Sequence, residues 1–224
     1  NMKRTKLKDR KLPNYTKGEE IFNMVTHIVG GGLGVIYLAI SVLIGAFKGN
    51  PWAIVSAAIY GFSTVTLFTM SSVYHGLKHN MGKKVLQVLD HCTIYFMIAG
   101  TYTSITLCAM REKYSYIAWA IFGVVWSLAA LGITLTAIDI KKYEKFAMIC
   151  YLCMGWSIVL AFKQTIDSIG IGGFYFMLAG GILYSIGAVF YKVGIKKKYI
   201  HSVFHIFVDL ASVAQFLGIA FYVL

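Results

Sequence analysis

The chain has 224 residues, of which 58% are hydrophobic and only 13% charged, and its formal net charge is +12. Roughly a quarter of the residues of a soluble domain are charged, so this composition excludes an ordinary soluble protein. A strong positive charge often indicates a nucleic-acid partner, but here Lys and Arg are concentrated in short gaps between long apolar runs. The pattern indicates a membrane protein, and no nucleic-acid partner is expected.

The apolar runs number seven, and each is close to the ~20 residues that a helix needs to cross a bilayer. They are expected at residues 22–47, 52–76, 85–109, 115–138, 146–163, 174–191 and 199–224. Barrel strands are shorter and alternate polar with apolar residues, so strands are not expected. We therefore predict an all-α membrane protein with a basic cytoplasmic arm at 1–21 and one seven-helix transmembrane domain at 22–224. The first run is too long for a signal-peptide core and is expected to stay in the mature protein.

The distribution of Lys and Arg predicts the orientation. Seventeen of the 21 lie in the N-terminal arm and in the second, fourth and sixth gaps, whereas four lie on the other side. Basic residues accumulate on the cytoplasmic side of a membrane protein. The N-terminus is therefore predicted inside and, with seven spans, the C-terminus outside.

Ionisable acids and imidazoles within the spans are costly in hydrocarbon and indicate functional sites. They are His27, His75, Asp90, His91, His201, His205 and Asp209. Several of them should lie at one depth, because the second span ends, and the third and seventh begin, at the cytoplasmic side. Since the topology came from Lys and Arg alone, this convergence is an independent observation.

Two of these groups have the spacing of metal ligands. His201 and His205 are four residues apart and share one face of a helix, as in zinc-binding helices. A third imidazole, from His75, would complete three nitrogen ligands with an open position, the arrangement of catalytic zinc. Ser71 shares the face of His75, and Asp90 could accept a hydrogen bond from metal-bound water or from a ligand histidine.

The other polar groups favour simpler roles. His79, in a gap, is expected at the membrane interface. His91 follows Asp90 but points about 100° away on the helix, which favours a supporting contact over a ligand role. Asp209 extends the His201–His205 face by one turn and would either orient a ligand histidine or make a local polar contact.

The first span has a polar face of its own. Glu20, Asn23 and His27 are spaced by three and four residues, which favours a polar contact between helices. The GGGLG run at 30–34 follows no strand, so it predicts close helix packing through Gly30 and Gly34 instead of a dinucleotide-binding loop.

Cys150 and Cys153 form C-x-x-C within a predicted span and beside no βαβ pattern. A redox role is therefore not favoured.

Four stretches carry a resemblance to a known family. They are EEIFNMVTH (19–27), SSVYH (71–75), LDHCTIYFMIAGTYTS (89–104) and HSVFH (201–205). In this combination and order the chain resembles the hemolysin III family, the bacterial branch of the progestin and adipoQ receptor proteins. It departs from the family pattern at Ser104, where proline is usual, and at Asp209, where an apolar residue is expected.

The resemblance implies a seven-helix fold with the N-terminus inside, in a bacterial cytoplasmic membrane. It implies Zn²⁺ held by His75, His201 and His205, with Ser71 and Asp90 at the positions of the family's serine and aspartate. Relatives in the wider superfamily include alkaline ceramidases, which hydrolyse lipid amides, and adiponectin receptors. The family takes its name from a haemolytic activity and has been linked to membrane lipid homeostasis.

Three functions are considered for these residues. A zinc hydrolase would act on a lipid amide or ester entering from the cytoplasmic leaflet, with Asp90 and Ser71 as catalytic residues. A regulator of membrane state would use zinc as a structural clasp. A cytolysin is the least favoured, because no continuous polar stripe of the kind a pore needs is evident. The expected partners are membrane lipids, and basic gaps could attract anionic headgroups at roughly 1 kcal/mol for each Lys or Arg.

Overall fold

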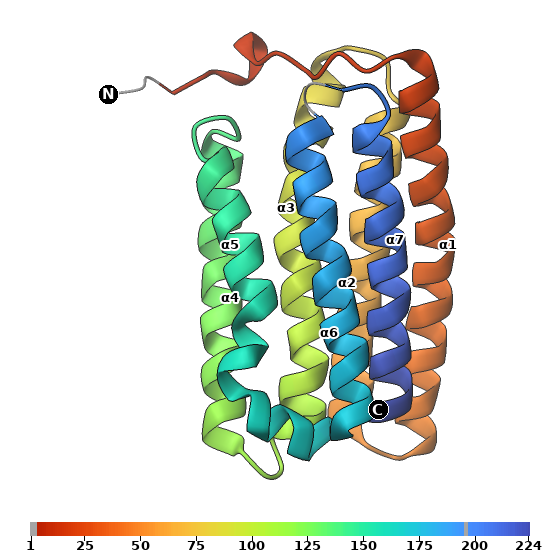
Figure 1. The fold of residues 1–224 in the computed structure, drawn as a ribbon, viewed down its shortest axis with the longest axis vertical. Coiled ribbons are helices and arrows are strands. Elements are labelled where there is room, and N and C mark those ends of the chain that lie inside the picture. Colours follow the sequence, from red (N-terminus) through yellow and green to blue (C-terminus); the bar gives the residue numbers. More distant parts are fainter. Residues whose placement is uncertain (1–3, 195–196) are drawn as a thin grey trace.

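The computed structural model describes residues 4–194 and 197–224, and this part of the chain is helical, without strands. The helices pack side by side as an elongated bundle (Figure 1). They are α1 (Lys17–Phe47), α2 (Pro51–Gly76), α3 (Met81–Thr103), α4 (Ser115–Ile138), α5 (Glu144–Trp156), α6 (Phe162–Gly194) and α7 (Ile200–Gly218). Six helical segments of the described chain are long and apolar enough to cross a membrane. The prediction of an all-α membrane protein is therefore confirmed.

The segment from α5 to α6 differs from the two separate spans expected at 146–163 and 174–191. A 3-10 helix at Ser157–Ala161 joins the two helices, so that Glu144–Gly194 is one continuous helical segment. Gly170 interrupts it with a φ of 69°, which a residue without a side chain adopts readily. In Figure 1 the chain descends along α5, turns at the lower end of the bundle and ascends along α6. Seven crossings remain a prediction.

The helices α1 and α3 start four to five residues earlier than the apolar runs suggest, because capping residues set their first turns. Thr16 caps α1, where its hydroxyl accepts from the Glu19 backbone N–H and the Glu19 carboxylate accepts from the Thr16 N–H at 2.8 Å. Asn80 caps α3 by accepting from the Lys83 N–H at 2.8 Å. Lys83, which the sequence analysis counted in a basic surface gap, consequently lies inside α3 and is only 1% exposed.

The glycines of α1 allow close packing against α2, as the sequence predicts. A Cβ built at Gly30 would lie 2.6 Å from the Phe68 ring, and one at Gly34 would lie 3.3 Å from Val65. The polar face of α1 consequently lies against the last turn of α2 and the first turn of α7.

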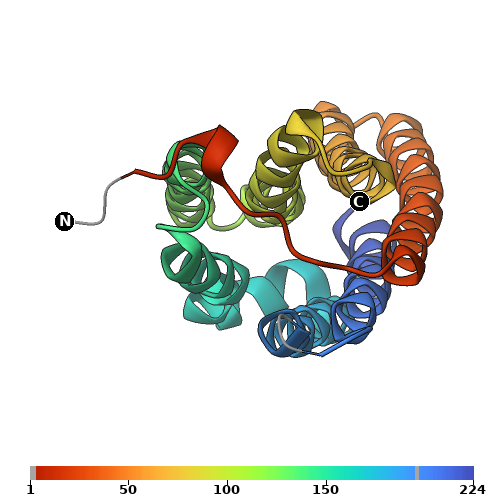
Figure 2. The same cartoon turned by 90° about the horizontal axis from the view of Figure 1, so that it is seen from above.

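The described part of the N-terminal arm crosses the end of the bundle, as Figure 2 shows from above. The Arg10 guanidinium donates to the Ile138 carbonyl at 3.1 Å, and the Thr5 N–H donates to Asp139 at 2.7 Å. Burial raises the pKa of Asp139, but its backbone hydrogen bonds and Arg10 outweigh this and hold that pKa below its usual value. The carboxylate therefore stays charged at neutral pH and fastens the arm to the end of α4.

Candidate metal centre

Three histidines converge at the end of the bundle crossed by the arm. One ring nitrogen from each of His75, His201 and His205 lies within 4.8 Å of the other two. The residues are 2%, 7% and 1% exposed, respectively, and come from the end of α2 and the start of α7. The spacing of four places the Nε2 atoms of His201 and His205 3.2 Å apart. The convergence predicted from sequence is confirmed, and this buried group could hold a metal ion.

The unpaired ring nitrogen of His75 is suited to binding such an ion. His75 Nε2 is buried and has no hydrogen-bond partner among the described residues, whereas His75 Nδ1 lies 2.7 Å from Glu20 Oε2. A carboxylate acceptor holds the ring proton on Nδ1, so the Nε2 lone pair is available. Three buried imidazole nitrogens are a donor set that suits zinc.

Glu20 joins the group to two other helices. Its second oxygen, Oε1, accepts a hydrogen bond from Lys83 Nζ at 2.6 Å, and Lys83 also donates to the Leu77 carbonyl at 2.9 Å. α1, α2 and α3 are thus connected through one carboxylate. Lys83 was not predicted to lie at the site; the signal that could have identified it is Asn80, a helix-capping residue three positions earlier.

Asn23 and His27 also lie beside the histidines, one and two turns along α1. Asn23 Oδ1 accepts from the Ser202 hydroxyl at 2.6 Å. The His27 ring stacks on His205, with ring centroids 3.8 Å apart and planes inclined by 27°. These contacts join α1 to α7, as expected of a polar helix–helix contact, but they also surround the metal group.

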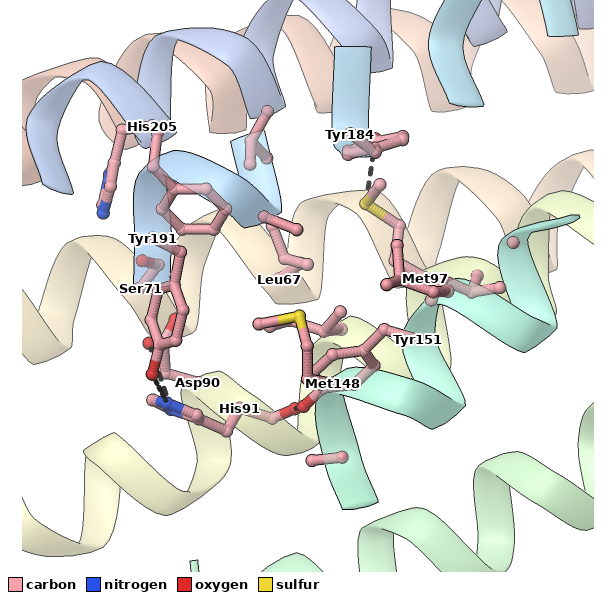
Figure 3. Close-up of a pocket in the computed structure, with 18 of the residues that line it drawn as sticks. Leu67, Ser71, Asp90, His91, Met97, Met148, Tyr151, Tyr184, Tyr191 and His205 are labelled. Carbon is pink, nitrogen blue, oxygen red and sulfur yellow. Dashed lines mark hydrogen bonds and ion pairs between the residues drawn. The ribbon is translucent and has the colours of Figure 1, made fainter. Parts of the chain in front are cut away.

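A cavity of about 180 Å³ begins at His201 and His205 and extends into the bundle. Ser71 and Asp90 line it beside the two histidines. Figure 3 shows Ser71, Asp90 and Tyr191 at one end, and Met97 and Tyr184 at the other. The walls are mainly apolar and include Leu67, Ile94, Met97, Met148, Leu152 and Phe204. The site therefore combines a few polar groups with an apolar enclosure, which is typical of small-molecule sites.

His91 lies at the cavity but has partners for both ring nitrogens. Its Nδ1 lies 2.8 Å from the Gln87 carbonyl, and its Nε2 lies 3.1 Å from the Tyr191 hydroxyl. Nδ1 donates to the carbonyl, and Nε2 is paired with the tyrosine hydroxyl. His91 is consequently engaged in supporting contacts and has no nitrogen free for a metal.

The arm closes this end of the cavity. Pro13 and Tyr15 belong to its lining, and the Tyr15 ring stacks on His201. Burial raises the pKa of the Tyr15 phenol, so the hydroxyl stays neutral. Composition alone had indicated only a basic tail at 1–21, and no signal in that segment identified Tyr15.

The remaining candidates lie farther from the group. Asp209 Oδ1 faces Gly30 of α1, where an added Cβ would lie 2.5 Å away, and it has no hydrogen-bond partner among the described residues. His79 is exposed in the connection between α2 and α3. Cys150 is buried and Cys153 exposed, and both thiols are free.

Comparisons with known proteins identify the family of this chain. The family described as "Haemolysin-III related" matches residues 15–216. Hemolysin-3 of Bacillus cereus is 35% identical over 206 residues, which are 92% of each chain. The hemolysin-3 homolog of Bacillus subtilis is 35% identical over 208 residues, 93% of this chain and 96% of the relative.

A more distant relative is human. The monocyte to macrophage differentiation factor of Homo sapiens is 28% identical over 187 residues, 80% of this chain and 75% of the relative. No solved structure matches this chain significantly.

Proposed function

Because the chain belongs to the haemolysin III family, we propose that it is a zinc-dependent hydrolase of lipid amides or esters. It would span a bacterial cytoplasmic membrane seven times, with its N-terminus inside and its C-terminus outside. The observation that carries the proposal is that two histidines of the metal group, together with Ser71 and Asp90, line one apolar cavity. A structural clasp would need no such cavity beside it.

The cavity suits an acyl chain. Its apolar walls would hold the chain, while the carbonyl group would lie at the polar end near His201 and His205. Asp90 lies in a mainly apolar wall. Ionisable residues within membrane-spanning helices are energetically costly and usually functional, which supports a role for Asp90 in the reaction.

Each residue of the site would have a separate role in the hydrolysis. A zinc ion held by the three histidines would supply Lewis acidity, which acidifies water and polarises a carbonyl group. Asp90 would accept the proton that water loses as its oxygen attacks the carbonyl carbon. The Ser71 hydroxyl would donate a hydrogen bond to the carbonyl oxygen as negative charge develops there. The bond to the amine or alcohol then breaks, and the leaving group takes the proton from Asp90.

The test compares wild-type and Asp90→Asn protein, each purified with zinc and reconstituted with a broad lipid extract. Mass spectrometry should find fatty-acid products with the wild type and far less with Asp90→Asn, because the amide cannot accept the proton. His79→Ala, changed at an exposed residue outside the cavity, serves as the control and should match the wild type. Indistinguishable profiles from wild-type and Asp90→Asn protein, both carrying zinc, would refute the hydrolase and leave a membrane regulator with structural zinc as the better account.

A further inference from the structure

Within the described chain, Glu20 is the carboxylate that bridges His75 and Lys83. One oxygen lies 2.7 Å from Nδ1 of His75, and the other lies 2.6 Å from Nζ of Lys83. Both partners are almost fully buried, since His75 is 2% and Lys83 1% exposed. We propose that Glu20 is a positioning residue of the metal centre and that Lys83 anchors it there. The inference rests on the metal centre of the proposed function but not on hydrolysis.

The physical reason lies in the two nitrogens of an imidazole. A metal-binding histidine presents one nitrogen to the ion, and its orientation depends on what holds the other. Because Glu20 accepts a hydrogen bond from the Nδ1–H group, it fixes both the tautomer and the rotation of the His75 ring. Nε2, which has no partner among the described residues, then points toward the group formed with His201 and His205.

The lysine explains why the carboxylate stays in place. The Glu20 side chain is 15% exposed, and a carboxylate so largely withdrawn from water is stabilised by a partner of opposite charge. Lys83 supplies it and is itself held by the Leu77 carbonyl at 2.9 Å, beyond the end of α2. The ammonium group therefore fixes Glu20 relative to the helix that carries His75. The other two ligands share α7, so His75 is the ligand whose placement relative to them depends on contacts between helices.

A neighbouring residue provides a matched control. Glu19 is more deeply buried than Glu20, but its carboxylate accepts from the backbone N–H groups of Thr16 and Tyr199, at 2.8 and 2.7 Å. It caps α1 and holds the start of α7 without touching a histidine of the metal group through a hydrogen bond. Glu19→Gln therefore disturbs the same helix end, whereas only Glu20→Gln disturbs the His75 contact.

The experiment measures zinc affinity of the full-length proteins in detergent by competition with a chelator. Glu20→Gln should bind zinc roughly 10- to 100-fold more weakly than the wild type, the usual effect of losing such a partner. Lys83→Met should weaken binding in the same direction, and Glu19→Gln should stay close to the wild type. The absorption bands of the cobalt(II)-loaded proteins report ligand geometry and should change in Glu20→Gln but not in Glu19→Gln.

Several results would overturn the inference. Wild-type affinity and an unchanged cobalt spectrum in Glu20→Gln would do so, as would an equal loss in Glu19→Gln. If Glu20→Gln does not fold, wild-type affinity in Lys83→Met refutes the anchoring role and with it the proposal. A wild type that binds no metal removes the metal centre and this inference together. A wild type that binds zinc without hydrolysing lipids refutes the proposed enzyme alone.

Discussion

The ring of Tyr15 lies nearly parallel to the ring of His201, with centroids 4.9 Å apart and planes inclined by 17°. The arm thus covers one face of the metal group with an aromatic ring. Tyr15→Ala should accelerate the loss of zinc to a chelator by up to roughly tenfold, since such ring pairs contribute about 0.5–1.5 kcal/mol. Tyr15→Phe keeps the ring and should lose zinc at the wild-type rate. Equal rates in the wild type and Tyr15→Ala would show that the arm does not protect the site.

The metal content of single histidine variants tests the ligand set. The wild type should purify with about one zinc per chain. Alanine at His75, His201 or His205 should greatly reduce that content and lower thermal stability, because a bound metal would join α2 to α7. His79→Ala should retain zinc. Full occupancy in the His201→Ala, His205→Ala double variant, measured by elemental analysis, would contradict the assignment.

Ser71→Ala tests the proposed hydrogen bond to the developing oxyanion. Loss of one such donor should lower kcat by roughly tenfold to a thousandfold. The zinc content should not change, because Ser71 is not a member of the metal group. The comparison is between kcat and metal content of the same preparations. A drop in kcat that follows a drop in zinc would instead assign Ser71 to metal binding.

Gly30→Ala tests the close packing of α1. The new Cβ would lie 2.5 Å from Asp209 Oδ1 and 2.6 Å from the Phe68 ring, and overpacking of this kind typically destabilises by about 1–3 kcal/mol. Gly32→Ala is the matched control, since its Cβ would meet nothing within 4 Å. Both changes raise helix propensity equally, so a difference in Tm in detergent reports the packing alone.

A reporter fused to the C-terminus tests the topology. The charge distribution, seventeen basic residues against four, predicts that the reporter is active outside the cytoplasmic membrane and silent inside. The start of α1 and the C-terminus lie at opposite ends of the bundle in Figure 1, which an odd number of crossings requires. A cytoplasmic reporter signal would mean that α5 and α6 together do not cross twice.

Much of the fold and of the metal group could be predicted from the sequence, for a simple reason. The bilayer imposes a length on every crossing helix and a charge bias on every gap, so both can be counted along the chain. Once the depth of each helix end is known, His75, Asp90 and the two histidines of α7 must lie at one level.

Spacing within a helix decides which side chains share a face, so the sequence also predicted the His201–His205 pair.

The tertiary structure decided the contacts between helices. Glu20 was expected to share a polar contact, but only the packing of α1 against α2 and α3 places it between His75 and Lys83. Lys83 was assigned to the basic gap between the second and third spans, because a lysine in such a gap has no periodicity that reveals burial. Tyr15 and the turn at Gly170 were likewise not foreseen. Depth and helical face follow from the order of residues along one chain, whereas the rotation of each helix toward its neighbours is set by side-chain packing and appears only when the bundle is assembled.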